Sequence, residues 1–253
     1  MRVSRFVLMG SVLVTAGCFQ GQRLIKLNVD GSGTIVDTIK LSEQAKGMLA
    51  GFEQADKSTP AEKKSKKEAK LKDRATKMGE GVTLVSFDVA ADGSEKMTYS
   101  FKDINKVKVS NGPSPSDSDS DSKEEPFTFK FSKAGGSSTL TVLSPKPKAS
   151  DKPAEKKPEK PEEMAQQIAM VKSMMAGLKM SMAVEVNGKL IKTSSPYSAG
   201  STVTLLELDF DQLDEAGLKK MASSGDSPDP SAFKGVKGVK ISGQETTIEF
   251  AAK

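Results

Sequence analysis

The stretch "LIKLNVDGSGTIVDTIKLS" (residues 24–42) decides the fold of this chain, because two alternating segments flank an Asp-Gly turn. The alternating apolar residues are Ile25, Leu27 and Val29 before the turn and Ile35, Ile39 and Leu41 after it. Asp-Gly between two such segments is among the strongest local signals for a β-hairpin, since glycine accepts the positive φ that the turn requires. Each strand is then expected to bury one face and leave the other wetter, as in an antiparallel sheet.

The same pattern recurs further along the chain. Further hairpins are predicted at 85–101 around "ADGS", at 127–142 around "KAGGS" and at 180–190 around Asn187-Gly188. Two more half-apolar strands are predicted at 202–208 and 246–250. Repeated short strands punctuated by turn residues predict a domain dominated by sheet.

Four segments have the periodicity of helices that could cover such a sheet: 42–54, 60–77, 164–178 and 209–221. The second begins with a capping box formed by Thr59 and Glu62 and is expected to lie mostly in solvent. Asp209 is the expected N-cap of the last helix. The sequence therefore predicts an α+β fold, a twisted antiparallel β-sheet of hairpins packed against a few helices.

One of these helices carries a regular apolar stripe. Its residues, spaced by four, three, four and three positions, are Met164, Ile168, Val171, Met175 and Leu178. Such spacing places all five on one face, which could pack as core or line a site for an apolar ligand. We expect core packing, against a sheet face formed by Phe127, Phe129 and Phe131, because protein interiors are normally close-packed.

Charged and Pro- or Ser-rich segments mark the loops. Solvated loops are predicted at about 111–126 and 144–161, since neither has apolar residues to bury. The strand and helix order in 22–110 resembles that in 126–250, so the two halves could descend from a duplication. Residues 18–253 are thus interpreted as one α+β domain.

The N-terminus has a different composition. Arg2 and Arg5 precede the apolar stretch Phe6–Ala16, which is too short to cross a bilayer, where ~20 residues are needed, but suits a signal peptide. Ala16 and Gly17 then precede Cys18, the single cysteine of the chain. These residues resemble the lipobox of bacterial lipoproteins, although Thr15 stands where leucine is usual.

The resemblance implies that the signal peptide, residues 1–17, is cleaved between Gly17 and Cys18, and that Cys18 carries the acyl chains, palmitate among them. Phe19 replaces the aspartate that usually marks inner-membrane retention, which favours the outer membrane if the cell has two membranes. An ordinary cleaved signal with a spare thiol and a buried N-terminal helix remain alternative interpretations.

The hairpin of residues 24–42, together with "VEVNGKLIKT" and "TVTLLELDF", is also similar to a group of uncharacterised envelope lipoproteins and to the LppM-type lipoprotein domain. The LppM-type resemblance implies helices covering a curved sheet and a connection with lipid binding. It rests on the first hairpin and on the order of strands and helices.

The residue types for common catalytic sites are scarce. The chain has no histidine, and its one cysteine belongs to the lipobox-like segment, so the usual nucleophile–base pairs are not expected. The run "DSDSDS" (117–122) lacks the glycine and glutamate of a calcium loop, and the methionines fit core packing better than copper binding. Glu207, Asp209 and Asp211 are interpreted as helix-capping residues rather than catalytic carboxylates. No cofactor or metal is expected.

Composition also limits the partners. Without residues 1–17 the formal net charge falls from +5 to +3, and there is no tryptophan to stack on bases, so nucleic acid is not an expected partner. We therefore expect a non-enzymatic, lipid-anchored protein of the cell envelope, attached to the membrane through N-terminal acyl chains. Its role would be binding or structural, toward an envelope protein, polysaccharide or lipid. The alternative is a carrier of lipid or another apolar ligand in a cavity between sheet and helix.

Overall fold

The structure, a computed structural model, describes residues 19–43, 46–47, 58–113, 125–146, 166, 168–169, 172, 175–223 and 233–252. Its longer strands are β1 (Phe19–Leu27), β2 (Gly33–Leu41), β3 (Thr83–Val89), β4 (Glu95–Phe101), β6 (Phe127–Ala134), β7 (Ser137–Leu143), β8 (Lys179–Val186), β9 (Lys189–Thr193), β11 (Thr202–Asp209) and β13 (Glu245–Ala251). Short strands are β5 (Lys108–Val109), β10 (Ser198–Ala199) and β12 (Val239–Ile241). Helices are α2 (Pro60–Lys77) and α4 (Glu215–Ser223), with 3₁₀ turns η2 (Ile104–Lys106) and η4 (Phe210–Gln212).

The larger sheet has eight strands in the order β10-β11-β8-β1-β2-β4-β3, with β12 also pairing with β11. The predicted hairpins β1–β2 and β3–β4 are confirmed, and both pair antiparallel. Strand β1 lies in the middle of this sheet, because its other edge pairs in parallel with β8. That parallel pair joins segments far apart in sequence and was not predicted.

The smaller sheet has five strands in the order β5-β6-β7-β13-β9, and it contains the predicted hairpin β6–β7. The predicted hairpin around Asn187-Gly188 is wrong. Strand β8 pairs with β1 and β11, whereas β9 pairs with β13, so these two residues carry the chain from one sheet to the other. The partners of these two adjacent strands are therefore distant segments, and the turn signal between them does not pair them with each other.

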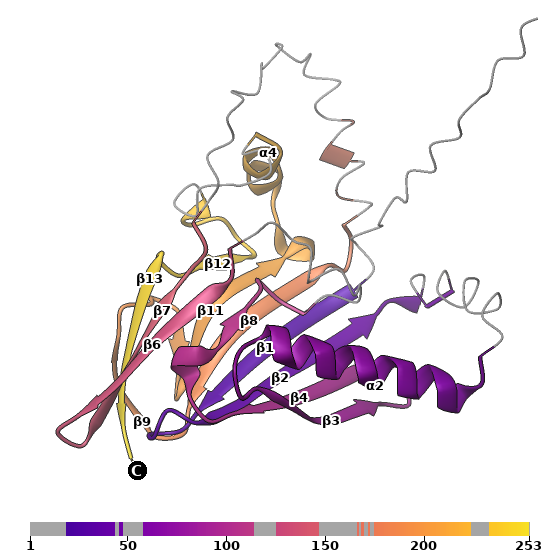
Figure 1. The fold of residues 1–253 in the computed structure, drawn as a ribbon. Coiled ribbons are helices and arrows are strands. Elements are labelled where there is room, and N and C mark those ends of the chain that lie inside the picture. The colour runs from indigo at the N-terminus through magenta and orange to yellow at the C-terminus, as the bar shows by residue number, and fades with distance from the viewer. Residues whose placement is uncertain are drawn as a thin grey trace, which may run out of the picture.

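The two sheets and α2 enclose one hydrophobic core. Figure 1 shows the five-stranded sheet lying over one half of the eight-stranded sheet and α2 lying over the other half. Inward-facing residues of all three layers join one buried cluster, exemplified by Ile25, Leu71, Tyr99, Leu140 and Phe250. The predicted α+β architecture is thus confirmed. The larger sheet is covered by a second sheet as well as by a helix, whereas helices alone were predicted to cover it.

Helix α2 forms as its sequence predicts. The capping box is complete, since the Thr59 hydroxyl accepts from the Glu62 backbone N–H and the Glu62 carboxylate accepts from the Thr59 backbone N–H at 2.7 Å. Leu71, Ala75 and Met78 are buried, and most of the remaining side chains are exposed or half-buried. The prediction of a largely solvated helix is confirmed.

The predicted helix over 209–221 is wrong in its extent. The chain forms η4, leaves helical geometry at Leu213 and begins α4 at Glu215. Asp209 makes no side-chain capping bond, because its carboxylate is used by Lys179 and Gln212. Asp214 instead accepts from the Gly217 backbone N–H at 2.7 Å at the start of α4.

Among the residues that the structure describes, no helix combines the length and apolar character needed to cross a membrane. Most of the predicted helix 42–54 and most of both predicted loops lie outside the described residues. The proposed duplication of the two halves stays a prediction.

Candidate functional site

The start of β1 is the first feature that bears on function. Phe19, which directly follows Cys18 in the sequence, is the first residue of this strand. Phe19 pairs with Leu41 of β2, and the next residue, Gln20, pairs with Lys179 of β8. A chemical group attached to residue 18 would therefore be directly adjacent to the first residue of β1, the central strand of the larger sheet. Gly17 and Cys18 themselves lie outside the described residues.

The predicted apolar stripe is only partly described. Ile168 and Leu178 are buried and Met175 is half-buried in a second hydrophobic cluster, while Met164 and Val171 lie outside the described residues. The other buried members of this cluster are Phe210, Leu213, Leu218, Phe233 and Val239. The expected packing on Phe127, Phe129 and Phe131 is wrong, because those residues belong to the first cluster. Phe19 and Met180 also pack against the second cluster, which places the N-terminal end of β1 beside it.

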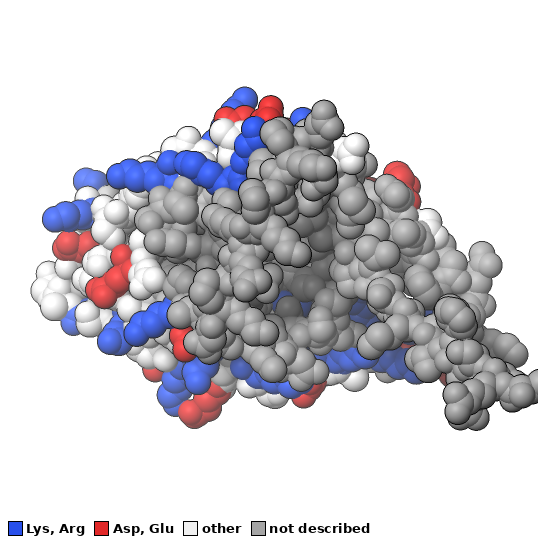
Figure 2. All heavy atoms as spheres, turned by 90° about the horizontal axis from the view of Figure 1, so that it is seen from above, with Lys and Arg blue, Asp and Glu red and all other residues white. Residues whose placement is uncertain are grey.

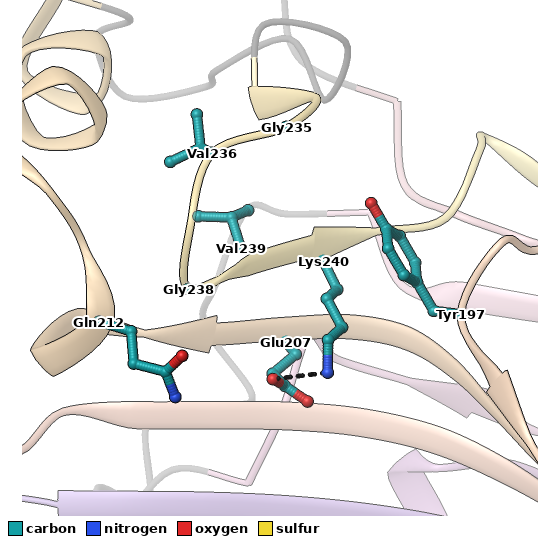
Figure 3. Close-up of a pocket in the computed structure, with 8 residues that line it drawn as sticks. All are labelled: Tyr197, Glu207, Gln212, Gly235, Val236, Gly238, Val239 and Lys240. Atoms are coloured by element: carbon teal, nitrogen blue, oxygen red, sulfur yellow. Dashed lines mark ion pairs between the residues drawn. The ribbon is translucent and has the colours of Figure 1, made fainter.

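A cleft opens on the side of β11 that carries β12. Its volume is about 360 Å³, within the lower part of the range of small-molecule sites. The residues that line it are Tyr197, Glu207, Gln212, Gly235, Val236, Gly238, Val239 and Lys240. Figure 3 shows Tyr197 at one end and Gln212 at the other, with Glu207 and Lys240 between them.

Paired charges form the floor of this cleft. Glu207 on β11 and Lys240 on β12 face each other in the antiparallel ladder, and their side chains form an ion pair at 3.0 Å. The Glu207 side chain is 22% exposed and that of Lys240 is 44% exposed, so both remain accessible. The pair therefore presents acceptors and donors to the cleft while adding no net charge.

A second ion pair supports Gln212. Lys179 and Asp209 lie 3.0 Å apart, and the Gln212 side-chain amide donates to the same Asp209 oxygen at 2.8 Å. Burial acts to raise the pKa of Asp209, but the hydrogen bond and charge of Lys179 outweigh it, so the pKa lies below the usual 3.8. The hydrogen bond that Lys179 donates to Asp209 raises the pKa of Lys179. Since its amide nitrogen is committed to Asp209, Gln212 can offer its oxygen to a ligand.

Two consecutive turns build the opposite wall. In "FKGVKGVK" (233–240), Val236 N–H donates to Phe233 O at 3.0 Å and Val239 N–H donates to Val236 O at 3.3 Å. Each turn has a glycine with positive φ at its third position, +79° at Gly235 and +82° at Gly238. A Cβ on Gly238 would lie 2.6 Å from the Asp209 carbonyl oxygen, so this turn approaches the end of β11 closely.

Sequence reasoning did not find this cleft. It noted Glu207 and Asp209, but it interpreted them as helix caps, whereas each carboxylate pairs with a lysine. The available signal was the repeated Lys-Gly-Val triplet of 234–239, whose glycines permit the two turns. Tyr197 could not be placed, because its position depends on contacts formed in the folded chain, such as the hydrogen bond that the Thr204 N–H of β11 donates to the Tyr197 carbonyl oxygen at 2.8 Å.

The surface charge at the upper end of the molecule is mixed. Figure 2 shows basic and acidic side chains interspersed around this face. Exposed ion pairs among the described residues include Lys40 with Asp92 at 3.5 Å and Lys46 with Glu43 at 2.7 Å. Hydrogen bonds from Ser94 hold the pKa of the exposed Asp92 at about 2. Within the described residues, no group of three or more Asp, Glu, Cys or His side chains is arranged to hold a metal ion.

No protein-family model matches this sequence. Nor does any curated protein match it. Among solved structures, the chain is similar to the NMR structure of the folded domain of the Mycobacterium tuberculosis LppM protein. The match has a TM-score of 0.31 and 11% identity, and it covers 93% of this chain and 91% of that chain. A likeness at this level carries no argument about function.

Proposed function

We propose that this protein is a non-enzymatic lipoprotein of the cell envelope, anchored through Cys18, which binds an envelope component. The observation that carries the proposal is the junction at Cys18. A short apolar segment ends in Ala16-Gly17-Cys18, and strand β1 begins at the very next residue. An exported chain with one cysteine needs some use for that thiol, and acylation is the use that this segment favours.

The physical consequence is a short and firm attachment. A single acyl chain holds a protein only marginally at a membrane, at ~0.8 kcal/mol per buried methylene, so several chains on Cys18 would be needed for stable anchoring. Because no linker separates Cys18 from β1, the central strand would begin at the lipid surface. The domain would then stand on the end of the larger sheet that includes Phe19.

A binding role fits the chemistry of the domain better than catalysis. The chain has no histidine, its cysteine is assigned to the anchor, and the two charged residues that line the cleft, Glu207 and Lys240, are paired with each other. Paired charges at fixed positions suit recognition through hydrogen bonds, whereas catalysis by acid and base needs groups that can exchange protons near neutral pH.

A carrier of lipid or another apolar ligand is the second candidate. The observation that favours it is the second hydrophobic cluster, against which Phe19, Met175 and Met180 pack while remaining only partly buried. Flexible methionine side chains adapt to varied apolar ligands. Native mass spectrometry of the purified protein separates the two roles, because a carrier would retain a lipid mass that a binding module would lack.

The anchor is tested by Cys18→Ser in the native host, followed by labelling with radioactive palmitate and detergent phase partitioning. We expect the variant to lose the label and to leave the detergent phase, or to accumulate as an uncleaved precursor. Thr15→Leu is the matched control, since it brings the segment closer to the usual lipobox and should keep both label and partitioning. A Cys18→Ser protein of mature mass that stays in the detergent phase would refute the anchor.

A further inference from the structure

We propose that the cleft lined by Tyr197, Glu207, Gln212 and Lys240 binds a neutral saccharide unit of an envelope glycan. The proposal deepens the binding role proposed above by naming a ligand class and a site. It does not depend on the anchor, because the cleft is formed by β11, β12 and the two turns that precede β12.

Charge is the first argument. The cleft contains one carboxylate and one ammonium group, joined by the ion pair of Glu207 and Lys240 at 3.0 Å. An anionic ligand at Lys240 would be repelled by the nearby Glu207 carboxylate, and a cationic ligand at Glu207 would be repelled by the Lys240 ammonium. A neutral polyhydroxylated ligand can instead donate to Glu207 and accept from Lys240 while the pair persists.

The apolar parts of the wall give the second argument. A sugar ring has one face of C–H groups and an edge of hydroxyls, so it needs an apolar platform beside hydrogen-bonding groups. Tyr197 supplies an aromatic ring, and Val236 and Val239 supply aliphatic surface. The other tyrosine of the chain, Tyr99, is fully buried in the core.

The third argument is that the cleft is already in place before any ligand binds. Glu207 and Lys240 are fixed by the β11–β12 ladder, and Gln212 is held by its bond to Asp209. The loop opposite is fixed by its two turns and by the Asp209 N–H, which donates to Gly238 O at 2.8 Å. A preformed arrangement reduces the entropy lost on binding, which matters for a weak polar ligand.

The size of the site limits the ligand. A volume of about 360 Å³ suits one or two sugar rings rather than a long oligosaccharide. The partly exposed Lys240 shows that the cleft is open to solvent on one side, so the rest of a glycan chain could continue outside.

The test uses the full purified protein in a polyoxyethylene detergent, which avoids sugar head groups. The probes are neutral trisaccharides of hexose and of N-acetylhexosamine, with hexose 6-phosphate and glucosamine as charged comparators. Binding is followed by saturation-transfer NMR and by tyrosine fluorescence. Because the chain has no tryptophan and Tyr99 is buried, a fluorescence change on binding reports on Tyr197.

We expect at least one neutral trisaccharide to bind and the charged comparators to bind more weakly. Tyr197→Ala should weaken the neutral sugar about tenfold through loss of the ring contact, while Tyr197→Phe keeps the ring and most of the affinity. Glu207→Gln should weaken the neutral sugar and strengthen hexose 6-phosphate, because it releases Lys240 to pair with the phosphate. Glu185→Gln on β8 is the matched control, because Glu185 also forms an ion pair with a lysine, Lys26, at 3.6 Å. This variant should leave sugar binding unchanged.

Three results would overturn the proposal. The first is that none of the neutral sugars binds at about 10 mM, a concentration that detects even very weak sites. The second is tighter binding of a charged comparator by the unaltered protein. The third is a neutral sugar whose affinity is unchanged in Tyr197→Ala, since the binding site would then lie elsewhere. Each result leaves the Cys18 anchor untouched, because the anchor is tested by labelling and partitioning.

Discussion

Arg23 and Asp37 form a buried ion pair between the two strands of the first hairpin. The Arg23 Nε donates to Asp37 Oδ1 and its Nη2 donates to Asp37 Oδ2, both at 2.7 Å. The two side chains are 1% and 0% exposed and occupy directly opposite positions in the β1–β2 ladder. Arg23 Nη1 also donates to the Ser110 carbonyl oxygen at 2.8 Å, and Arg74 of α2 lies 3.6 Å from Asp37. The pair therefore ties the hairpin to α2 and to the segment after β5.

The first prediction is that Asp37→Ala lowers the free energy of unfolding by about 3–5 kcal/mol, because it leaves the Arg23 guanidinium buried without its counter-charge. Urea unfolding followed by circular dichroism measures the change. Glu185→Ala removes one partner of the exposed Lys26–Glu185 pair and should cost less than about 1 kcal/mol.

The double variant Arg23→Met/Asp37→Leu separates the cost of an unpaired charge from the value of the pair. We expect it to be several kcal/mol more stable than Asp37→Ala, since apolar residues of similar volume often replace a buried pair without loss. A double variant as unstable as the single one would contradict this account and would show that the pair itself holds the hairpin to α2.

Local sequence patterns correctly predicted the hairpins β1–β2, β3–β4 and β6–β7, in which the two strands on either side of the turn pair with each other. Asp30-Gly31 is such a case, because the turn and the alternating residues on both sides act over a few positions. Asn187-Gly188 has an equally good turn signal, yet its flanking strands enter different sheets. The choice there is made by contacts with β1 and β13, which lie far away in the sequence, and no local pattern records it.

The cleft was beyond sequence reasoning for the same reason. Its lining comes from three separate segments, around Tyr197, at 207–212 and at 235–240, which the β11–β12 pairing brings together. The buried pair of Arg23 and Asp37 had a weak signal, since each lies two residues from an inward-facing isoleucine, Ile25 or Ile35, and therefore on the same buried face of its strand. A charged residue at an inward position of each strand indicates pairing only once the register is known.

The second prediction concerns pH. The pKa of Asp209 lies below 3.8, because the hydrogen bond and charge of Lys179 outweigh the effect of burial. When the pKa of a carboxyl group is lower in the folded state than in the unfolded state, the group stabilises the fold at pH values above its unfolded-state pKa. This stabilisation is lost as the pH falls through the folded-state pKa. Asp209→Asn should therefore be destabilising at neutral pH, and its difference from the unaltered protein should shrink below about pH 4.

Urea unfolding at a series of pH values measures that difference. Asp88→Asn, at an exposed position of β3, is the control and should change the free energy of unfolding by less than about 0.5 kcal/mol throughout. A penalty for Asp209→Asn that stays constant down to about pH 2 would show that packing, not the charge of Asp209, stabilises this end of β11.

The third prediction compares the two glycines of the double turn. Gly235 and Gly238 have nearly the same positive φ, so alanine at either position has a similar backbone cost of about 1–2 kcal/mol. At Gly238 the new Cβ would also meet the Asp209 carbonyl oxygen at 2.6 Å, whereas at Gly235 it would meet no atom within 4 Å. Gly238→Ala should therefore be the more destabilising variant in thermal unfolding, and equal midpoints would contradict the close approach of this turn to β11.

The fourth prediction decides between a packed cluster and a ligand pocket at Ile168. Ile168 is 8% exposed and shares the second hydrophobic cluster with Leu178, Phe210 and Phe233. If these side chains pack on one another, Ile168→Ala should lower the free energy of unfolding by ~2–5 kcal/mol, through lost transfer energy and a residual cavity.

Ile191→Ala is the matched control. Because Ile191 is 52% exposed on β9, this variant should lower the free energy of unfolding by less than about 1 kcal/mol. Urea unfolding of delipidated protein measures both variants. A cost below about 1 kcal/mol for Ile168→Ala, together with lipid bound to the unaltered protein, would favour the carrier over the binding module.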